Sequence, residues 1–67
     1  MKDLGNLNNW TKNDLARVIV QALMNLDEPA RADSAAVKLV MRKPKARLVD
    51  FAQNAIEIIN RRRMEDA

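Results

Sequence analysis

Residues 43–63 read KPKARLVDFAQNAIEIINRRR, and this stretch decides the architecture of the chain. Its apolar side chains recur at spacings of three and four residues, and they comprise Leu48, Val49, Phe51, Ala52, Ala55, Ile56, Ile58 and Ile59. At about 100° per residue they cover roughly half of a helical circumference, and polar side chains cover the rest. Pro44 suits the first turn of a helix, where its missing N–H is not needed. The pattern therefore predicts an amphipathic helix over residues 44–63.

Another helical pattern begins after Thr11. Threonine is a preferred N-cap residue, and Asp14, three residues later, takes the place of the usual glutamate of a capping box. The apolar side chains that follow span an arc of roughly 240°, whereas a surface helix needs little more than about 100°. We therefore expect a helix over residues 12–26 that is buried on more than one side.

The segment between these two patterns predicts a further helix. Residues 27–29 (DEP) fit a helix start, because acidic side chains and proline are favoured in the first turn. Lys43 precedes a proline and is biased away from helical geometry, so this helix is expected over residues 28–42. The alternative is a short loop up to Asp33, followed by a shorter helix with Ser34 as its N-cap. The joint to the helix at residues 44–63 is expected to lack the three- to four-residue turn of a helix-turn-helix motif.

Together these patterns predict an all-α fold, a small three-helix domain with a short irregular lead-in over residues 1–10. The chain has 67 residues and no cysteine, so its core is marginal and no disulfide reinforces it. Its helices carry more apolar side chains than one copy is expected to bury, which predicts a homodimer. The expected dimer interface comprises Val20, Met24, Phe51, Ala55, Ile58 and Ile59. The alternative is that Trp10, which we expect to lie on the core, covers the surplus apolar face together with the lead-in.

The composition argues against an enzyme. The chain contains no His, Cys or Tyr, so the usual general base, thiol nucleophile and phenolic acid are missing. Its carboxylates are scattered, and it has neither a glycine-rich phosphate loop nor a calcium-loop pattern. We therefore expect no catalytic residue, no metal site and no cofactor. No apolar run approaches the roughly 20 residues of a membrane span, and the first residues lack a secretory pattern, so a cytoplasmic protein without membrane contact is expected.

Charge is distributed unevenly along the chain. Residues 1–33 carry four basic and five acidic side chains, whereas residues 34–67 carry eight and four. No acidic residue lies between Ser34 and Val49. Basic clusters neutralise phosphates and release counterions, so this asymmetry favours a small nucleic-acid-binding regulatory protein. The expected contact residues are Arg31, Lys38, Arg42, Lys43, Lys45 and Arg47.

Two short stretches resemble the helix openings of SAP-type and Rho N-terminal helix-extension-helix modules. They are WTKNDL at residues 10–15 and KPKARLV at residues 43–49. In those families lysines at the second opening bind nucleic acid, so the resemblance implies a nucleic-acid contact at the second stretch. The chain departs from these families between the two openings, where it has a predicted helix in place of a glycine-bearing extension.

The competing hypothesis is a protein-binding helical module, such as an adaptor, an antitoxin-like partner or a small inhibitor. Wide apolar faces on the helices at residues 12–26 and 44–63 would supply its docking surface. The net charge of only +3 agrees with this hypothesis. Basic side chains near helix C-termini also offset the helix dipole without any ligand. Salt separates the two hypotheses, because nucleic-acid binding weakens steeply with salt and apolar docking does not.

Overall fold

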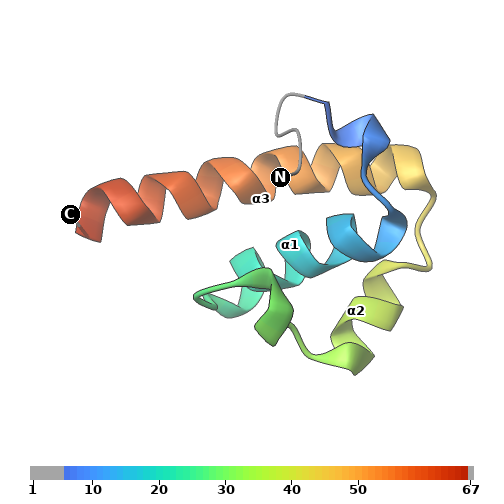
Figure 1. Cartoon of the computed structure of the whole chain (residues 1–67), viewed down its shortest axis with the longest axis horizontal. Helices are drawn as coiled ribbons and strands as arrows, with labels where there is room; N and C mark the ends of the chain where they lie inside the picture. The colour runs from blue at the N-terminus through green and yellow to red at the C-terminus, as the bar shows by residue number, and fades with distance from the viewer. Residues whose placement is uncertain (1–5, 67) are drawn as a thin grey trace.

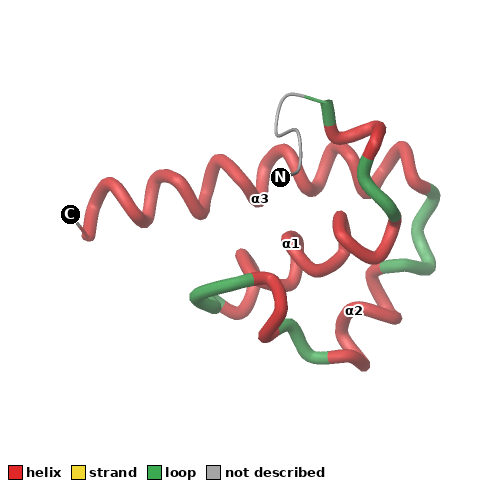
Figure 2. The backbone as a smooth tube through the Cα atoms, in the orientation of Figure 1, coloured by secondary structure: helices red, strands yellow, loops and turns green. Residues whose placement is uncertain are grey.

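The computed structural model describes residues 6–66, and the regular elements in this range are all helical (Figure 1, Figure 2). In chain order they are η1 (Leu7–Asn9), α1 (Lys12–Met24), η2 (Pro29–Arg31), α2 (Ser34–Val40) and α3 (Lys45–Asp66). The η elements are single 3₁₀ turns. The prediction of a small all-α domain with three helices is thus confirmed. Residues 1–5 of the predicted lead-in lie outside the described range.

Both ends of α1 are set by capping residues. The hydroxyl oxygen of Thr11 accepts a hydrogen bond from the N–H of Asp14 at 3.2 Å, which confirms the predicted N-cap. Asn25 ends the helix in the left-handed conformation, with φ 56° and ψ 49°, and its N–H donates to the carbonyl of Gln21. Asparagine tolerates this conformation better than most residues do. α1 therefore ends at Met24, two residues before the predicted boundary.

α1 is the central helix, with α3 on one side and α2 on the other (Figure 1). Toward α3, the buried cluster comprises Leu15, Val18, Ile19 and Ala22 of α1 with Leu48, Val49, Ala52 and Ala55 of α3. Toward α2, Ala16 and Val20 are buried together with Ala32 and Val37. The predicted wide apolar arc is therefore buried on two sides. α1 and α3 run in the same direction (Figure 1).

The expected helix over residues 28–42 is wrong, because the chain forms two separate pieces there. η2 is one turn long, and Ala32 and Asp33 after it are extended, at ψ 134° and 129°. The Asp33 carboxylate accepts a hydrogen bond from the N–H of Ala36 at 3.2 Å, so Asp33 is the N-cap of α2. A side chain that caps in this way competes with helix continuation. The shorter alternative is close to the structure, with Asp33 as the cap in place of Ser34.

The lead-in packs on the seam between α1 and α3. Leu7 and Trp10 are buried in the same cluster as the residues that join these two helices, with 4% and 6% of their surface exposed. The prediction that Trp10 lies on the core is confirmed. The lead-in therefore covers part of the apolar surface that one copy was expected to leave exposed.

α3 is the longest element. The carbonyl of Pro44 accepts from the N–H groups of Arg47 at 3.0 Å and Leu48 at 3.1 Å, so Pro44 is the residue just before the first turn. At about 1.5 Å per residue, α3 is roughly 33 Å long and α1 roughly 20 Å long. The C-terminal end of α3 therefore extends past α1 (Figure 1). Met64, near this end, keeps 80% of its surface exposed.

Candidate nucleic-acid interface

Five of the six residues predicted to contact nucleic acid lie together at the joint between α2 and α3. We call this group the basic corner, and it comprises Lys38, Arg42, Lys43, Lys45 and Arg47. Lys38 is in the last turn of α2. Arg42 and Lys43 are in the connection, and Lys45 and Arg47 are in the first turn of α3. All five are exposed.

The connection between α2 and α3 spans residues 41–44, and it is the loop at the right-hand end of Figure 2. Its first half is tightly wound, since the N–H of Arg42 donates to Leu39 at 3.3 Å and that of Lys43 to Val40 at 3.2 Å. The expectation of a joint shorter than three to four residues is therefore wrong. α2 ends two residues before the predicted boundary, and this leaves the extra residues to the connection.

Arg31 does not belong to the basic corner. It lies on η2, before the start of α2, whereas Arg42 follows the end of that helix. Its Nε is 3.5 Å from Oε1 of Glu28, so its charge is already matched locally. On one continuous helix over residues 28–42, Arg31 would lie on nearly the same face as Lys38, seven residues later. The break at residues 32–33 removes that alignment.

The side chain of Lys45 makes a hydrogen bond within the fold. Its Nζ donates a hydrogen bond of 2.8 Å to the backbone carbonyl of Asn8, which joins the end of η1 to the start of α3. No pattern in the sequence predicts this contact, because the two residues are 37 positions apart. Lys45 therefore helps to hold the lead-in and is a weaker candidate for ligand contact than its neighbours.

Lys43 lies over the aromatic ring of Phe51. Its Nζ is 5.6 Å from the ring centroid, within the range of a cation–π interaction. Phe51 keeps 42% of its surface exposed. Arg47 is one turn before Phe51 on the same face of α3, because residues four apart in a helix are neighbours. An exposed aromatic ring is thus adjacent to two cations of the basic corner.

The helix dipoles act differently on the two halves of the corner. Lys38 and Arg42 are near the C-terminus of α2, where positive charge is favourable. Lys45 and Arg47 are near the N-terminus of α3, where it is unfavourable by about 0.3–1 kcal/mol each, and the first turn of α3 has no acidic residue. The helix dipoles therefore favour only the first pair.

The residues predicted to form a dimer interface fall into three groups by exposure. Val20 and Ala55 are buried within one chain, with 1% and 4% of their surface exposed, so they offer no surface to a second copy in this structure. Ile59 is half-buried beside α1. Met24, Phe51 and Ile58 are exposed at 52%, 42% and 40%. Phe51 and Ile58 are seven residues apart and form an apolar stripe along one face of α3.

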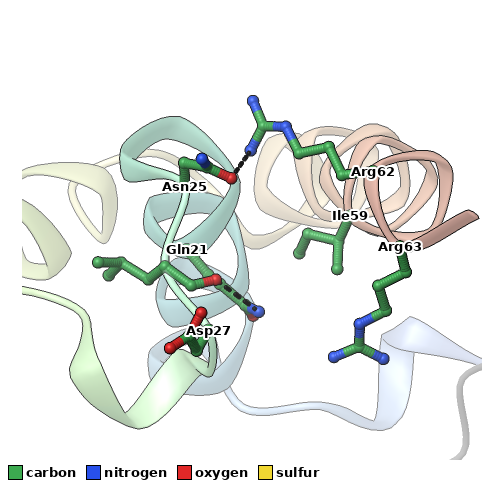
Figure 3. Close-up of a pocket in the computed structure, with 7 residues that line it drawn as sticks. Gln21, Asn25, Asp27, Ile59, Arg62 and Arg63 are labelled. Atoms are coloured by element: carbon green, nitrogen blue, oxygen red, sulfur yellow. Dashed lines mark hydrogen bonds between the residues drawn. The ribbon is translucent and has the colours of Figure 1, made fainter. Parts of the chain in front are cut away.

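A pocket of about 210 Å³ lies between the C-terminus of α1 and α3 (Figure 3). It is lined by Gln21, Asn25, Leu26, Asp27, Ile59, Arg62 and Arg63. Nη1 of Arg62 donates to the carbonyl of Ala22 at 2.8 Å and to Oδ1 of Asn25 at 3.1 Å, and the side chain of Arg63 diverges from it. The arginine run at residues 61–63 thus includes one side chain that caps α1.

Within residues 6–66, no group of His, Cys, Asp or Glu side chains is placed to hold a metal ion. None of the helices in this range has both the length and the apolar character needed to cross a bilayer. Comparison with models of protein families, with curated proteins and with solved structures finds no match for this chain, so the likeness to helix-extension-helix modules stays a resemblance between short stretches of sequence.

Proposed function

We propose that this chain is a small helical nucleic-acid-binding regulatory protein that acts as a dimer and contacts phosphates through the basic corner. The observation that carries the proposal is the clustering of five exposed cations at the joint between α2 and α3. Within the described residues, none of the five is paired with a carboxylate. Phosphates bind such clusters because contact releases condensed counterions.

The electrostatics of the corner supports this proposal. Like charges that lie this close repel one another, and two of them also lie at the positive end of the α3 dipole. Polyanion binding removes both unfavourable contributions at once. We expect Arg42, Lys43 and Arg47 to make most of the phosphate contacts, since Lys45 is bonded to Asn8.

Dimerisation enters the proposal through the exposed apolar side chains of α3 and α1. Leaving apolar surface in water forfeits about 25 cal/mol per Å². Ile58 is the best candidate for contact with a second copy, because it is an exposed apolar side chain on a long helix and lies about two turns from Phe51 and the basic corner. A dimer would also double the number of basic corners, which strengthens binding to an extended polyanion.

The decisive experiment compares two triple variants with the same net charge. The first is Arg42→Ala, Lys43→Ala and Arg47→Ala, and the second is Lys12→Ala, Arg61→Ala and Arg63→Ala. Retention on immobilised heparin and on nucleic acid is measured at low salt. We expect the first variant to lose retention and the second to keep it. Equal retention by both variants would rule out the basic corner as the binding site.

The alternative function is a protein-interaction module, and the exposure of Leu23, Met24 and Leu39 favours it. These side chains keep 76%, 52% and 60% of their surface exposed. A partner helix could bury them without any contribution from the basic corner. The salt dependence of ligand binding distinguishes this function. With three phosphate contacts, raising salt from about 50 to 200 mM should weaken nucleic-acid binding by about 20- to 40-fold, whereas apolar docking should hardly change.

A further inference from the structure

Phe51 is the exposed aromatic residue of a chain that has only two. Trp10, the other, is buried with 6% of its surface exposed, whereas Phe51 keeps 42%. Burial of an aromatic ring is strongly favourable, so a ring left in water on a short chain needs an explanation. Its position next to the basic corner supplies one.

The surroundings of the ring combine stacking surface with positive charge. Lys43 Nζ is 5.6 Å from the ring centroid, and Arg47 lies one turn away on the same face of α3. Arg42 precedes Lys43 in the connection and is exposed. An aromatic ring flanked by cations is the arrangement with which proteins bind single-stranded nucleic acid, where a base stacks on the ring and cations contact the adjacent phosphates.

The outward face of α3 argues against insertion of this helix into a duplex groove. Gln53 and Asn54, which could hydrogen-bond base edges, share that face with Asp50 and Glu57, and all four are exposed. At about 100° per residue, these four side chains lie about 60–160° around the helix from Phe51. Insertion of this polar face into a groove would bring the carboxylates of Asp50 and Glu57 toward the phosphates. A contact through Phe51 would instead bring cations of the basic corner toward the phosphates.

We infer that the basic corner binds a single strand, with Phe51 as the platform for one base and with Arg42, Lys43 and Arg47 on the flanking phosphates. This inference rests on the proposed function and specifies its ligand. Lys43 leaves the ring when a base arrives, because base stacking is stronger than a cation–π interaction at an exposed site. Its ammonium then pairs with a phosphate beside that base.

The test uses the full chain and three labelled probes: a 12-nucleotide dT strand, a 12-nucleotide rU strand and a 12-base-pair duplex. Fluorescence anisotropy measures the affinity of the wild type and of Phe51→Leu, Phe51→Trp and Ile58→Ala at one salt concentration. Ile58→Ala is the matched control for the apolar stripe: it leaves the ring in place, and any loss of binding that comes from weaker dimerisation is measured with this variant. Circular dichroism verifies that each variant is helical.

We expect the wild type to prefer a single strand over the duplex, and the tighter of the two strands identifies DNA or RNA as the ligand. Phe51→Leu should weaken single-strand binding by about 5- to 150-fold, which corresponds to the loss of one stacked base. Phe51→Trp should retain binding, with quenching of the new tryptophan by the strand, and Ile58→Ala should weaken binding clearly less than Phe51→Leu does.

Other outcomes separate this inference from the proposed function. If the duplex binds as tightly as the single strands, or if Phe51→Leu and Ile58→Ala weaken binding equally, stacking on Phe51 is wrong while the basic corner remains the site. If Phe51→Leu does not fold, an unquenched Phe51→Trp overturns the inference. If the wild type binds none of the probes, both the inference and the proposed function are wrong.

Discussion

The guanidinium of Arg62 on α3 donates a hydrogen bond of 2.8 Å to the backbone carbonyl of Ala22 on α1. The last carbonyls of a helix have no partner within the helix, so this contact satisfies one of them. The same nitrogen also reaches Oδ1 of Asn25, the residue that ends α1 in the left-handed conformation. The end of one helix is thus fixed by a side chain from another.

Arg62→Ala should destabilise the fold by about 1–2 kcal/mol, because hydrogen bonds to charged groups contribute about 1.5–3 kcal/mol and this one is partly exposed. Urea denaturation followed by circular dichroism measures the change. Arg61→Ala is the control, since Arg61 is exposed, and it should alter stability by less than about 0.5 kcal/mol. Equal effects of the two substitutions would contradict the capping role of Arg62.

Substitutions at Asn25 should separate its backbone role from its side-chain role. Asn25→Gly and Asn25→Ala both remove the acceptor for Arg62, but only glycine accepts φ 56° without strain. Asn25→Ala should therefore be less stable than Asn25→Gly by about 1 kcal/mol. The same denaturation experiment measures this difference. A more stable alanine variant would mean that α1 does not end in a left-handed residue in solution.

Asp33→Ala tests where α2 begins, because the sign of its effect depends on the answer. As an N-cap that accepts from Ala36, Asp33 should contribute about 1 kcal/mol, so the variant should be less stable. In a continuous helix over residues 28–42, the same substitution should stabilise by about 0.5 kcal/mol, since alanine is the better helix former. Ser34→Ala serves as the control and should change the free energy of unfolding by less than about 0.5 kcal/mol.

Self-association is expected to depend on Ile58, which is an exposed apolar side chain of α3. Sedimentation equilibrium at micromolar concentration should give twice the chain mass of 7.6 kDa for the wild type. Ile58→Asp should give the single-chain mass, because it places a charge in the proposed interface. Met64→Asp is the control: Met64 is also exposed, but it lies on another face of α3, and the variant should remain dimeric. A wild type that sediments at 7.6 kDa would refute the dimer.

Spacing along the chain predicted α1 and α3, with their starts at or within one residue of the observed positions. The three- and four-residue recurrence of apolar side chains located α1 and α3, and the Thr11 cap marked the start of α1. The wide apolar arc of α1 correctly indicated burial on two sides, and the acid-free run at residues 35–48 identified the basic corner. Such patterns are local, because positions on one helix share a face at fixed intervals.

The boundary of α2 was predicted wrongly because two local signals compete there. Residues 27–29 resemble a helix start, and they do form one helical turn, η2. Asp33 then caps a new helix, and only the burial of Ala32 and Val37 against α1 favours this second start. The position of Arg31 outside the basic corner follows from the same break.

The sequence by itself determined the helical fold class, the central position of α1 and the positive charge near the start of α3. Only the tertiary structure decided that Lys45 is bonded to Asn8, that Arg62 caps α1, and that Phe51 stays exposed beneath Lys43. The first two contacts join residues 37 and 40 positions apart. Their formation depends on how helices are placed against one another, and side-chain periodicity within a helix carries no information about that placement.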